Sequence, residues 1–211
     1  MLDLHVFLAN LPYIAFGVLG LFLCIQLYYI LFVYSKLSRY QIKPVQEGTE
    51  FPPLSVIICA HNEQDNIAQF LPDIMHQDYP NFEVIVVNDF STDNTPWILH
   101  EFEAKYPHLK IVDIKEHIRL KHGKKFAVSM GIKASKHQTL VFTDADCAPQ
   151  SNQWLKEVAA AFRPETEIVL GYSPYFKKKS LLNLLIRFET SHTAMSYFSY
   201  ALKGDAYMGV G

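Results

Sequence analysis

The chain begins with one long apolar stretch and continues with short apolar runs separated by segments of helix length. From Leu11 to Tyr34 there is no charged residue, and Gln26 is the one strongly polar side chain. At about 1.5 Å per residue such a helix measures roughly 36 Å, enough to cross a hydrocarbon core of about 30 Å. A signal peptide would have a basic start, a shorter apolar run and a small-residue cleavage site. The stretch therefore predicts a transmembrane helix. A core helix is the alternative, and the apolar character of the stretch all round disfavours it.

The basic residues around this stretch predict its orientation. Lys36, Arg39 and Lys43 follow it, whereas no Lys or Arg precedes it. Basic residues stay on the cytoplasmic side of a membrane. We therefore expect an anchor in the cell (inner or plasma) membrane, with the N-terminus outside and the rest of the chain in the cytoplasm.

Beyond the anchor, apolar runs rich in β-branched residues alternate with helical candidates. The runs are 54–59, 82–88, 110–114, 139–144 and 167–172, and the helical candidates are about 64–76, 95–105, 123–135 and 151–162. Continuous apolar runs are typical of strands covered on both faces. Their alternation with helices predicts right-handed βαβ units, and hence an α/β fold with a Rossmann-like, mostly parallel sheet and flanking helices.

Composition narrows the classes of function. A formal net charge of -2 and 50% apolar residues exclude a disordered tail and do not suit a nucleic-acid-binding protein. The three cysteines, Cys24, Cys59 and Cys147, have the spacing of neither a disulfide framework nor a zinc site. We expect reduced thiols.

Polar residues follow three of the predicted strands, where ligands bind in open parallel sheets. They lie in the segments 60–63, 88–93 and 143–147. Any one of them alone is as well explained by helix caps and turns, and Asp93 or Asn94 is the expected cap ahead of Pro96. Together they predict a ligand site at one edge of the sheet.

The ligand of this site is not held by the common phosphate loops. No Gly-x-Gly-x-x-Gly follows the first strand and no Gly-Lys-Ser/Thr loop is present, which argues against a dinucleotide dehydrogenase and a P-loop NTPase. Asp144 and Asp146 instead supply hard oxygen ligands for Mg²⁺ or Mn²⁺, which would bridge to a diphosphate.

Four segments in this order resemble a known family. They are PLSVIICAHNE (53–63), VIVVNDFSTDNT (84–95), HGKKFAVSMGIKAS (122–135) and LVFTDADCAP (140–149). They resemble the nucleotide-diphospho-sugar glycosyltransferases of family 2, the inverting GT-A group that includes cellulose, chitin and hyaluronan synthases. The resemblance runs from about residue 53 to the end of the chain.

The resemblance implies roles for individual residues. The nucleoside pocket would be lined by Ala60, His61, Asn62 and Glu63. Asp89 would bind the base or the ribose, and Lys124 would bind the base or the diphosphate. Asp144 would lie by the ribose and the donor sugar, and Asp146 would ligate the metal together with Asp144. Adjacent lysines cannot both enter one pocket, so a solvated helix start is the alternative for Lys124 and Lys125. Asn88, where the family often has Asp, and Ser129, where it often has Asn, put fine specificity in doubt.

The catalytic base is expected elsewhere. In the family this carboxylate lies further along the fold, beyond Gly211, and Glu189 and Asp205 are the late acidic candidates here. We therefore expect a fragment of a longer enzyme, inactive by itself.

A basic cluster and an apolar helix close the sequence. Lys177, Lys178 and Lys179 precede a helical segment at 180–204. Its expected stripe consists of Leu181, Leu185, Phe188, Met195, Phe198 and Leu202. The stripe predicts either a helix on the cytoplasmic membrane surface or a helix packed on the sheet.

The expected organisation has four parts: an anchor with its basic flank at 1–43, a linker at 44–52, a GT-A nucleotide-sugar-binding domain at 53–176, and an acceptor-side region starting at 177–211. The expected function is metal-assisted, inverting transfer of a sugar from a nucleotide-diphospho-sugar, such as a UDP-sugar, to a lipid or glycan acceptor. A processive polysaccharide synthase is the alternative within the family. Outside the family, the alternatives are a sugar-phosphate nucleotidyltransferase and an inactive membrane-tethered binding domain. The acidic segment 61–63 argues against the nucleotidyltransferase.

Overall fold

A computed structural model describes residues 4–41, 50–115, 123–162 and 166–207. The chain divides into two compact units, one formed by residues 1–43 and 172–211 and the other by residues 44–171. The four expected parts and their limits stay predictions. Lys43 and most of the expected linker lie outside the described residues.

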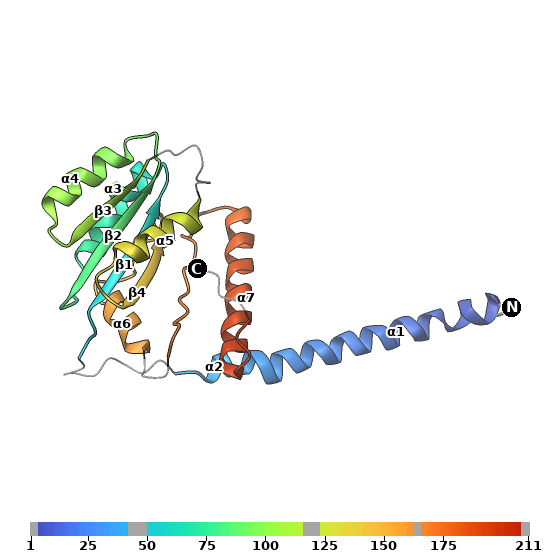
Figure 1. The fold of residues 1–211 in the computed structure, drawn as a ribbon. Coiled ribbons are helices and arrows are strands. Elements are labelled where there is room, and N and C mark those ends of the chain that lie inside the picture. Colours follow the sequence, from blue (N-terminus) through green and yellow to red (C-terminus); the bar gives the residue numbers. More distant parts are fainter. Residues whose placement is uncertain (1–3, 42–49, 116–122, 163–165, 208–211) are drawn as a thin grey trace. The chain divides into compact units, whose positions relative to one another are not determined.

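The larger unit is built on a parallel sheet. Its strands are β1 (Leu54–Ala60), β2 (Phe82–Asp89), β3 (Leu109–Ile114) and β4 (Thr139–Asp144), in the spatial order β3-β2-β1-β4 (Figure 1). In the central strand, Ile58 pairs with Val86 on one side and Thr143 on the other. The sequence prediction of a mostly parallel α/β sheet is confirmed.

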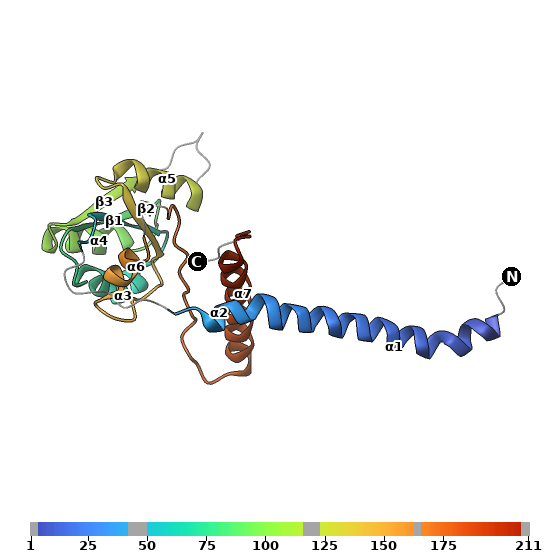
Figure 2. The same cartoon turned by 90° about the horizontal axis from the view of Figure 1, so that it is seen from below.

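Helices cover both faces of this sheet. They are α3 (Gln64–Met75), α4 (Thr95–Lys105), α5 (Lys124–Ala134) and α6 (Trp154–Ala161). Successive residues of a strand point to opposite faces, so Val84 and Val86 pack with α3, α4 and α6. Ile85 and Val87 pack instead on α5, which lies on the other side of the sheet (Figures 1 and 2).

The predicted strand at 167–172 is wrong. The described residues 166–172 are irregular, and Ile168 is 77% exposed. An apolar run becomes a strand only where another strand offers its backbone groups, and none of the four described strands pairs with this one. Such pairing is not encoded in the run itself.

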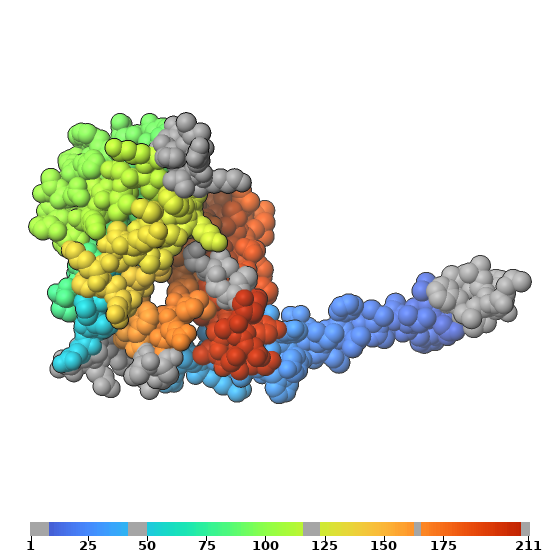
Figure 3. All heavy atoms as spheres, viewed as in Figure 1, coloured from blue at the N-terminus to red at the C-terminus, as the bar shows by residue number. Residues whose placement is uncertain are grey.

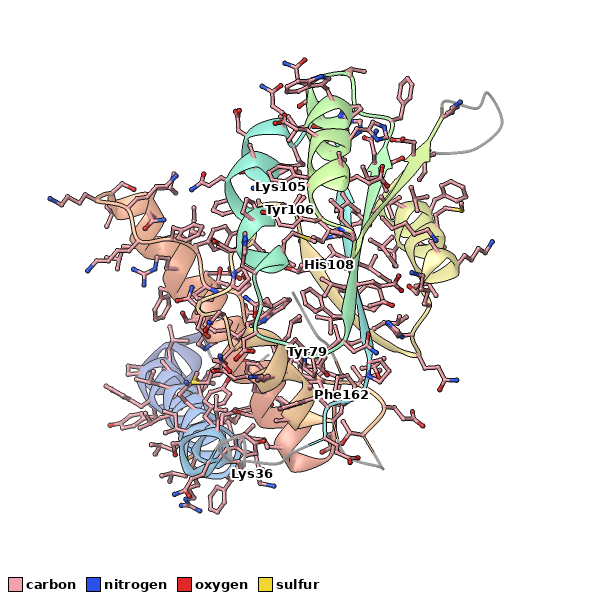
Figure 4. The ribbon with its side chains drawn as sticks, turned by 90° about the vertical axis from the view of Figure 1, so that its left-hand side faces the viewer. Lys36, Tyr79, Lys105, Tyr106, His108 and Phe162 are labelled. Atoms are coloured by element: carbon pink, nitrogen blue, oxygen red, sulfur yellow. The ribbon has the colours of Figure 1, made fainter. Side chains whose placement is uncertain are left out.

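Aromatic rings pack at the amino ends of the strands. Phe82 lies 4.9 Å from His108 and 6.3 Å from Tyr79, and His108 lies 6.2 Å from Tyr106, centroid to centroid. Tyr79, Tyr106 and His108 all lie on the same side of the sheet (Figure 4). Burial raises the pKa of Tyr79 to about 12. The packed rings thus lie at the amino ends of the strands, and the polar segments 60–63, 88–93 and 143–147 lie at the carboxyl ends.

The smaller unit contains the apolar helix. Its helices are α1 (Leu4–Tyr28), the π-helix η1 (Tyr29–Tyr34), α2 (Ser35–Arg39) and α7 (Leu181–Lys203). The continuous helical stretch Ala9–Arg39 is long and apolar enough to cross a membrane. Side chains 9–28 are all exposed, and α1 is bare along most of its length (Figure 3).

Helix α7 packs against the end of this stretch. The Tyr200 hydroxyl lies 3.4 Å from that of Tyr29, and the rings of His192 and Tyr34 meet edge to face at 6.2 Å. The buried side chains of α7 are Ala194, Tyr197 and Ser199. They are not members of the predicted apolar stripe, and Leu181, Leu185, Phe188 and Leu202 of that stripe are exposed.

Close packing of α5 on the sheet depends on Gly131. A Cβ atom at this position would lie 2.5 Å from Ile57 Cγ2 and 3.2 Å from Val87 Cγ2. Both atoms belong to stiff, buried, β-branched side chains, so Gly131→Ala should destabilise the fold by about 1–3 kcal/mol despite the better helix propensity of Ala. Urea unfolding of the full chain in detergent measures this.

The matched control is Gly171→Ala, where a Cβ atom meets nothing within 4 Å. It should leave the unfolding midpoint nearly unchanged. A Gly131→Ala protein as stable as the control would contradict the packing described for α5.

Candidate functional site

Two loops at the carboxyl edge of the sheet are joined by hydrogen bonds. The β1–α3 loop donates from Asn62 N to Ser91 Oγ (3.0 Å) and from Glu63 N to Thr95 Oγ1 (2.9 Å). In return, Thr92 N donates to Asn62 Oδ1 at 2.7 Å. These bonds hold the ends of β1 and β2 in one rigid arrangement.

The backbone of these loops includes two left-handed residues. Asn62 has φ 57° and Phe90 has φ 53°. Asn adopts this region more readily than most non-glycine residues, and here its Oδ1 accepts from Thr92 N of the facing loop. Of the two residues expected to cap α4, Asp93 accepts from Thr95 N at 3.0 Å, whereas Asn94 makes no side-chain cap.

A cavity of about 250 Å³ opens at this edge. Its lining comes from the carboxyl ends of β1, β2 and β4 and from the first turn of α5: Cys59, Ala60, His61, Glu63, Asp89, Lys124, Ala127, Asp144, Ala145 and Asp146. Seven of the eight residues predicted from the sequence are among them. The eighth, Asn62, is absent from the lining and bonds to the neighbouring loop.

A lysine and an aspartate form an ion pair within the lining. Lys124 Nζ lies 2.6 Å from Asp144 Oδ1. The hydrogen bond to Asp144 raises the pKa of Lys124, so this lysine keeps its proton near neutral pH. Lys125 is exposed and does not line the cavity. Of the two adjacent lysines, Lys124 is therefore the one that faces the cavity.

Hydrogen bonds to neighbouring groups orient two polar side chains at the cavity, His61 and Glu63. His61 Nδ1 lies 2.6 Å from the carbonyl oxygen of Asp89, so this nitrogen carries the proton and donates. Glu63 Oε2 accepts from Asn66 Nδ2 at 2.6 Å. Both side chains are thereby fixed before any ligand binds.

Three lining residues were not predicted from the sequence: Cys59, Ala127 and Ala145. Cys59 pairs with Asp144 across the strands, and its place just before Ala60 was the available signal. Burial raises the pKa of the Cys59 thiol to about 11, which keeps it neutral. It therefore lacks the thiolate character of a nucleophile.

The two departures from the family pattern have local explanations. Asn88 is buried; its Nδ2 donates to Asp113 Oδ1 at 2.8 Å and its Oδ1 accepts from Ser91 N at 3.2 Å. An aspartate could not donate to Asp113, so the amide suits this position. Ser129 Oγ donates to the carbonyl of Lys125 within α5.

The late acidic residues have partners of their own. Glu189 accepts from Thr193 Oγ1 at 3.1 Å, and Asp205 pairs with Lys203 at 3.1 Å. Neither residue is part of the cavity lining. The expected position of the catalytic base beyond Gly211 stays a prediction.

The donors available for a metal are few. Among the described residues, no group of three or more His, Cys, Asp or Glu side chains gathers as a wholly protein-made metal site requires. Asp144 and Asp146 contribute carboxylates to the cavity. Mg²⁺ often uses one or two carboxylates and completes its shell with substrate phosphates and water, and this donor set fits that mode.

The family model described as glycosyl transferase family 2 matches residues 55–205. The chain belongs to this family. The matched range contains all of the four strands except Leu54, together with the cavity lining and α7.

Curated relatives match part of the chain. It is 37% identical to the glycosyltransferase AglE of Haloferax volcanii over 107 residues, which are 50% of this chain and 34% of that protein. It is 29% identical to a beta-monoglucosyldiacylglycerol synthase of Nostoc over 143 residues, which are 67% of this chain and 30% of that protein. The chain thus spans about a third of the length of these relatives.

A solved structure supports the fold. A mannosyltransferase from Pyrobaculum calidifontis, solved with GDP-Man and Mn²⁺, superposes with a TM-score of 0.54 at 27% identity. The match covers 64% of this chain and 39% of that one. The GT-A, Rossmann-like fold expected from the sequence is confirmed.

The joined loops give a test at Asn62. Asn62→Ala removes the bond from Thr92 N and leaves at φ 57° a residue that adopts the left-handed region less readily than Asn. Asn62→Gly removes the same bond without that conformational cost. Asn62→Ala should therefore lower the free energy of unfolding by about 1 kcal/mol more than Asn62→Gly. Urea titrations of both variants measure the difference, and equal losses would show that the backbone at 62 is not held left-handed.

Proposed function

We propose that the chain is the donor-binding part of a membrane-anchored glycosyltransferase, of the hexosyltransferase type, that uses a nucleotide-diphospho-sugar. The supporting observation is the cavity at the carboxyl edge of the sheet, which combines the acidic side chains Glu63, Asp89, Asp144 and Asp146 with Lys124 in a family 2 chain. Carboxylates suit the hydroxyls and ring nitrogens of a nucleoside, and a cation suits its diphosphate.

The nucleoside would lie against the β1 and β2 ends. Glu63 and the backbone at 60–62 would line its pocket, with His61 held by the Asp89 carbonyl. Asp89 would accept from the base or ribose, and Asp144 would lie by the ribose and the donor sugar. The hydrogen bonds between the two loops support this role, because a pre-formed pocket spends less binding free energy on ordering itself.

The diphosphate would lie against Lys124 and a divalent cation, Mg²⁺ or Mn²⁺. Asp146 would hold the cation, with Asp144 as second carboxylate. When bound, such a cation neutralises the leaving diphosphate as a Lewis acid. Lys124 would contribute a further positive charge on the same group.

In inverting transfer, the acceptor hydroxyl oxygen bonds to the anomeric carbon from the side opposite the leaving group. The bond between that carbon and the diphosphate oxygen breaks as the new bond forms, and a carboxylate base takes the hydroxyl proton. A lipid or glycan is the proposed acceptor. The relative named as a glycolipid synthase supports single addition to a lipid. Relatives in Staphylococcus named poly-beta-1,6-N-acetyl-D-glucosamine synthase support the processive alternative.

The metal assignment is tested by Asp146→Asn in the full chain, reconstituted in lipid nanodiscs. Calorimetry with UDP, and in parallel with GDP, should show binding to the native chain that is about tenfold or more tighter with Mn²⁺ than with EDTA. The variant should lose this dependence, because a neutral amide is a weak ligand for a hard cation.

The matched control is Asp73→Asn, which removes an exposed carboxylate of α3 that does not line the cavity. It should keep the metal dependence of the native chain. Equal nucleotide affinity with Mn²⁺ and with EDTA in the native chain would refute the metal site.

The proposed location is the cell membrane. Helix α1 and its continuation would span the bilayer, and the exposed Lys36 and Arg39 would lie on the cytoplasmic side. The exposed Leu181, Leu185 and Phe188, preceded by the basic segment 177–179, would contact lipid at the same surface.

The orientation is tested by reporter fusions. A reporter that functions only in the cytoplasm should be active when joined after residue 43 and inactive when joined before residue 1 of the full chain, because the basic flank stays inside. The two fusions control for each other. The reverse pattern would refute the orientation, since sugar nucleotides are made in the cytosol.

A further inference from the structure

The ion pair at the cavity joins two residues to which the proposed function gives separate ligands. Lys124 is the first residue of α5 and Asp144 the last residue of β4, and their side chains meet with Nζ 2.6 Å from Oδ1. In the proposed complex, however, Lys124 faces the diphosphate and Asp144 faces the metal and ribose. Without ligand, each charge therefore has the other as its partner.

We propose that Lys124 is the counter-ion of the ligand-free donor site and is displaced from Asp144 when metal and nucleotide bind together, which makes metal binding depend on the nucleotide. This inference rests on the proposed function. It adds an order to the binding events and gives Lys124 a positioning role in the absence of ligand.

Charge repulsion explains why metal binding would depend on the nucleotide. A divalent cation that approaches Asp144 alone meets an ammonium group already on the carboxylate, and the two positive charges repel each other. A diphosphate brings negative oxygens that accept both cations. Lys124 then exchanges one carboxylate for phosphate oxygens without losing its ionic partner.

The geometry permits such an exchange. The Lys124 side chain is 65% exposed and Asp144 is 37% exposed, so moving the ammonium uncovers no buried charge. A lysine is a flexible point charge with rotatable donors, unlike the planar fork of an arginine. The hydrogen bonds of the β1–α3 and β2–α4 loops do not include Lys124, so those loops can stay in place.

The size of the effect follows from the exposure of the pair. Exposed ion pairs change affinities by a modest factor, so removing the ammonium should strengthen Mn²⁺ binding to the nucleotide-free site by about threefold to fivefold. By linkage, the factor by which UDP strengthens Mn²⁺ binding should fall to a similar extent.

The test measures free Mn²⁺ by electron paramagnetic resonance in titrations of the full chain in nanodiscs, with and without UDP. Lys124→Met should bind Mn²⁺ threefold to fivefold more tightly than the native chain without UDP, and should gain less from UDP. Lys124→Arg keeps the charge and should resemble the native chain. Lys125→Met is the matched control, because it removes the same charge from the adjacent exposed residue; it should change neither value.

Each result has one meaning. Equal nucleotide-free Mn²⁺ affinity in Lys124→Met and Lys125→Met would overturn the counter-ion role, while the proposed function would stand if UDP still strengthens Mn²⁺ binding to the native chain. No Mn²⁺ binding in any of the proteins would overturn both. Should Lys124→Met lose its helical circular dichroism, Lys124→Gln takes its place in the same comparison.

Discussion

The parallel pairing of β1 with both β2 and β4 is the constraint on which the site depends. Cys59 pairs with Val87 on one side and Asp144 on the other, so three strands end at nearly the same level. The polar residues that follow these three strands are therefore brought together at one edge of the sheet. A one-residue slip of β4 would turn Asp144 to the opposite face of the sheet and break the ion pair with Lys124. The buried β-branched residues on both faces hold this register, and Gly131 lets α5 approach closely enough to bring Lys124 to the same edge.

Charge balance is the second property of the site. The cavity contains more carboxylates than ammonium groups, and the Lys124–Asp144 pair neutralises one of each. The remaining acidic groups suit a ligand that brings its own cation. A nucleotide diphosphate with a divalent metal meets this condition, whereas a bare diphosphate would be repelled. In the proposed exchange, the hydrogen-bonded loops keep their positions while Lys124 changes its ionic partner.

Much of this was predictable from local sequence, and the exceptions share a physical cause. The strand at 54–60 was recognisable because a continuous apolar, β-branched run needs cover on both faces. The run at 139–144 was recognised by the same pattern, although it forms an edge strand in which Phe142 is 51% exposed. The run at 167–172 looks the same but is irregular, because strand formation requires a partner that the run does not specify. The strand-end residues of the cavity followed from the rule that parallel strands deliver their ends to one edge, and Lys124 followed from the family resemblance. The turning of Asn62 toward Thr92, the choice between Lys124 and Lys125, and the buried face of α7 depend on tertiary contacts, which no local pattern encodes.

Our central proposal is that the carboxyl edge of the sheet holds a metal and a nucleotide diphosphate in a single complex. Pulsed electron–nuclear double resonance of Mn²⁺ bound to the full chain with UDP tests it directly. We expect a phosphorus-31 hyperfine coupling of the size given by directly coordinated phosphate, and we expect the signal to be lost when Asp146 is replaced. A Mn²⁺ ion that shows no phosphorus coupling, or that keeps it unchanged without Asp146, would contradict the claim.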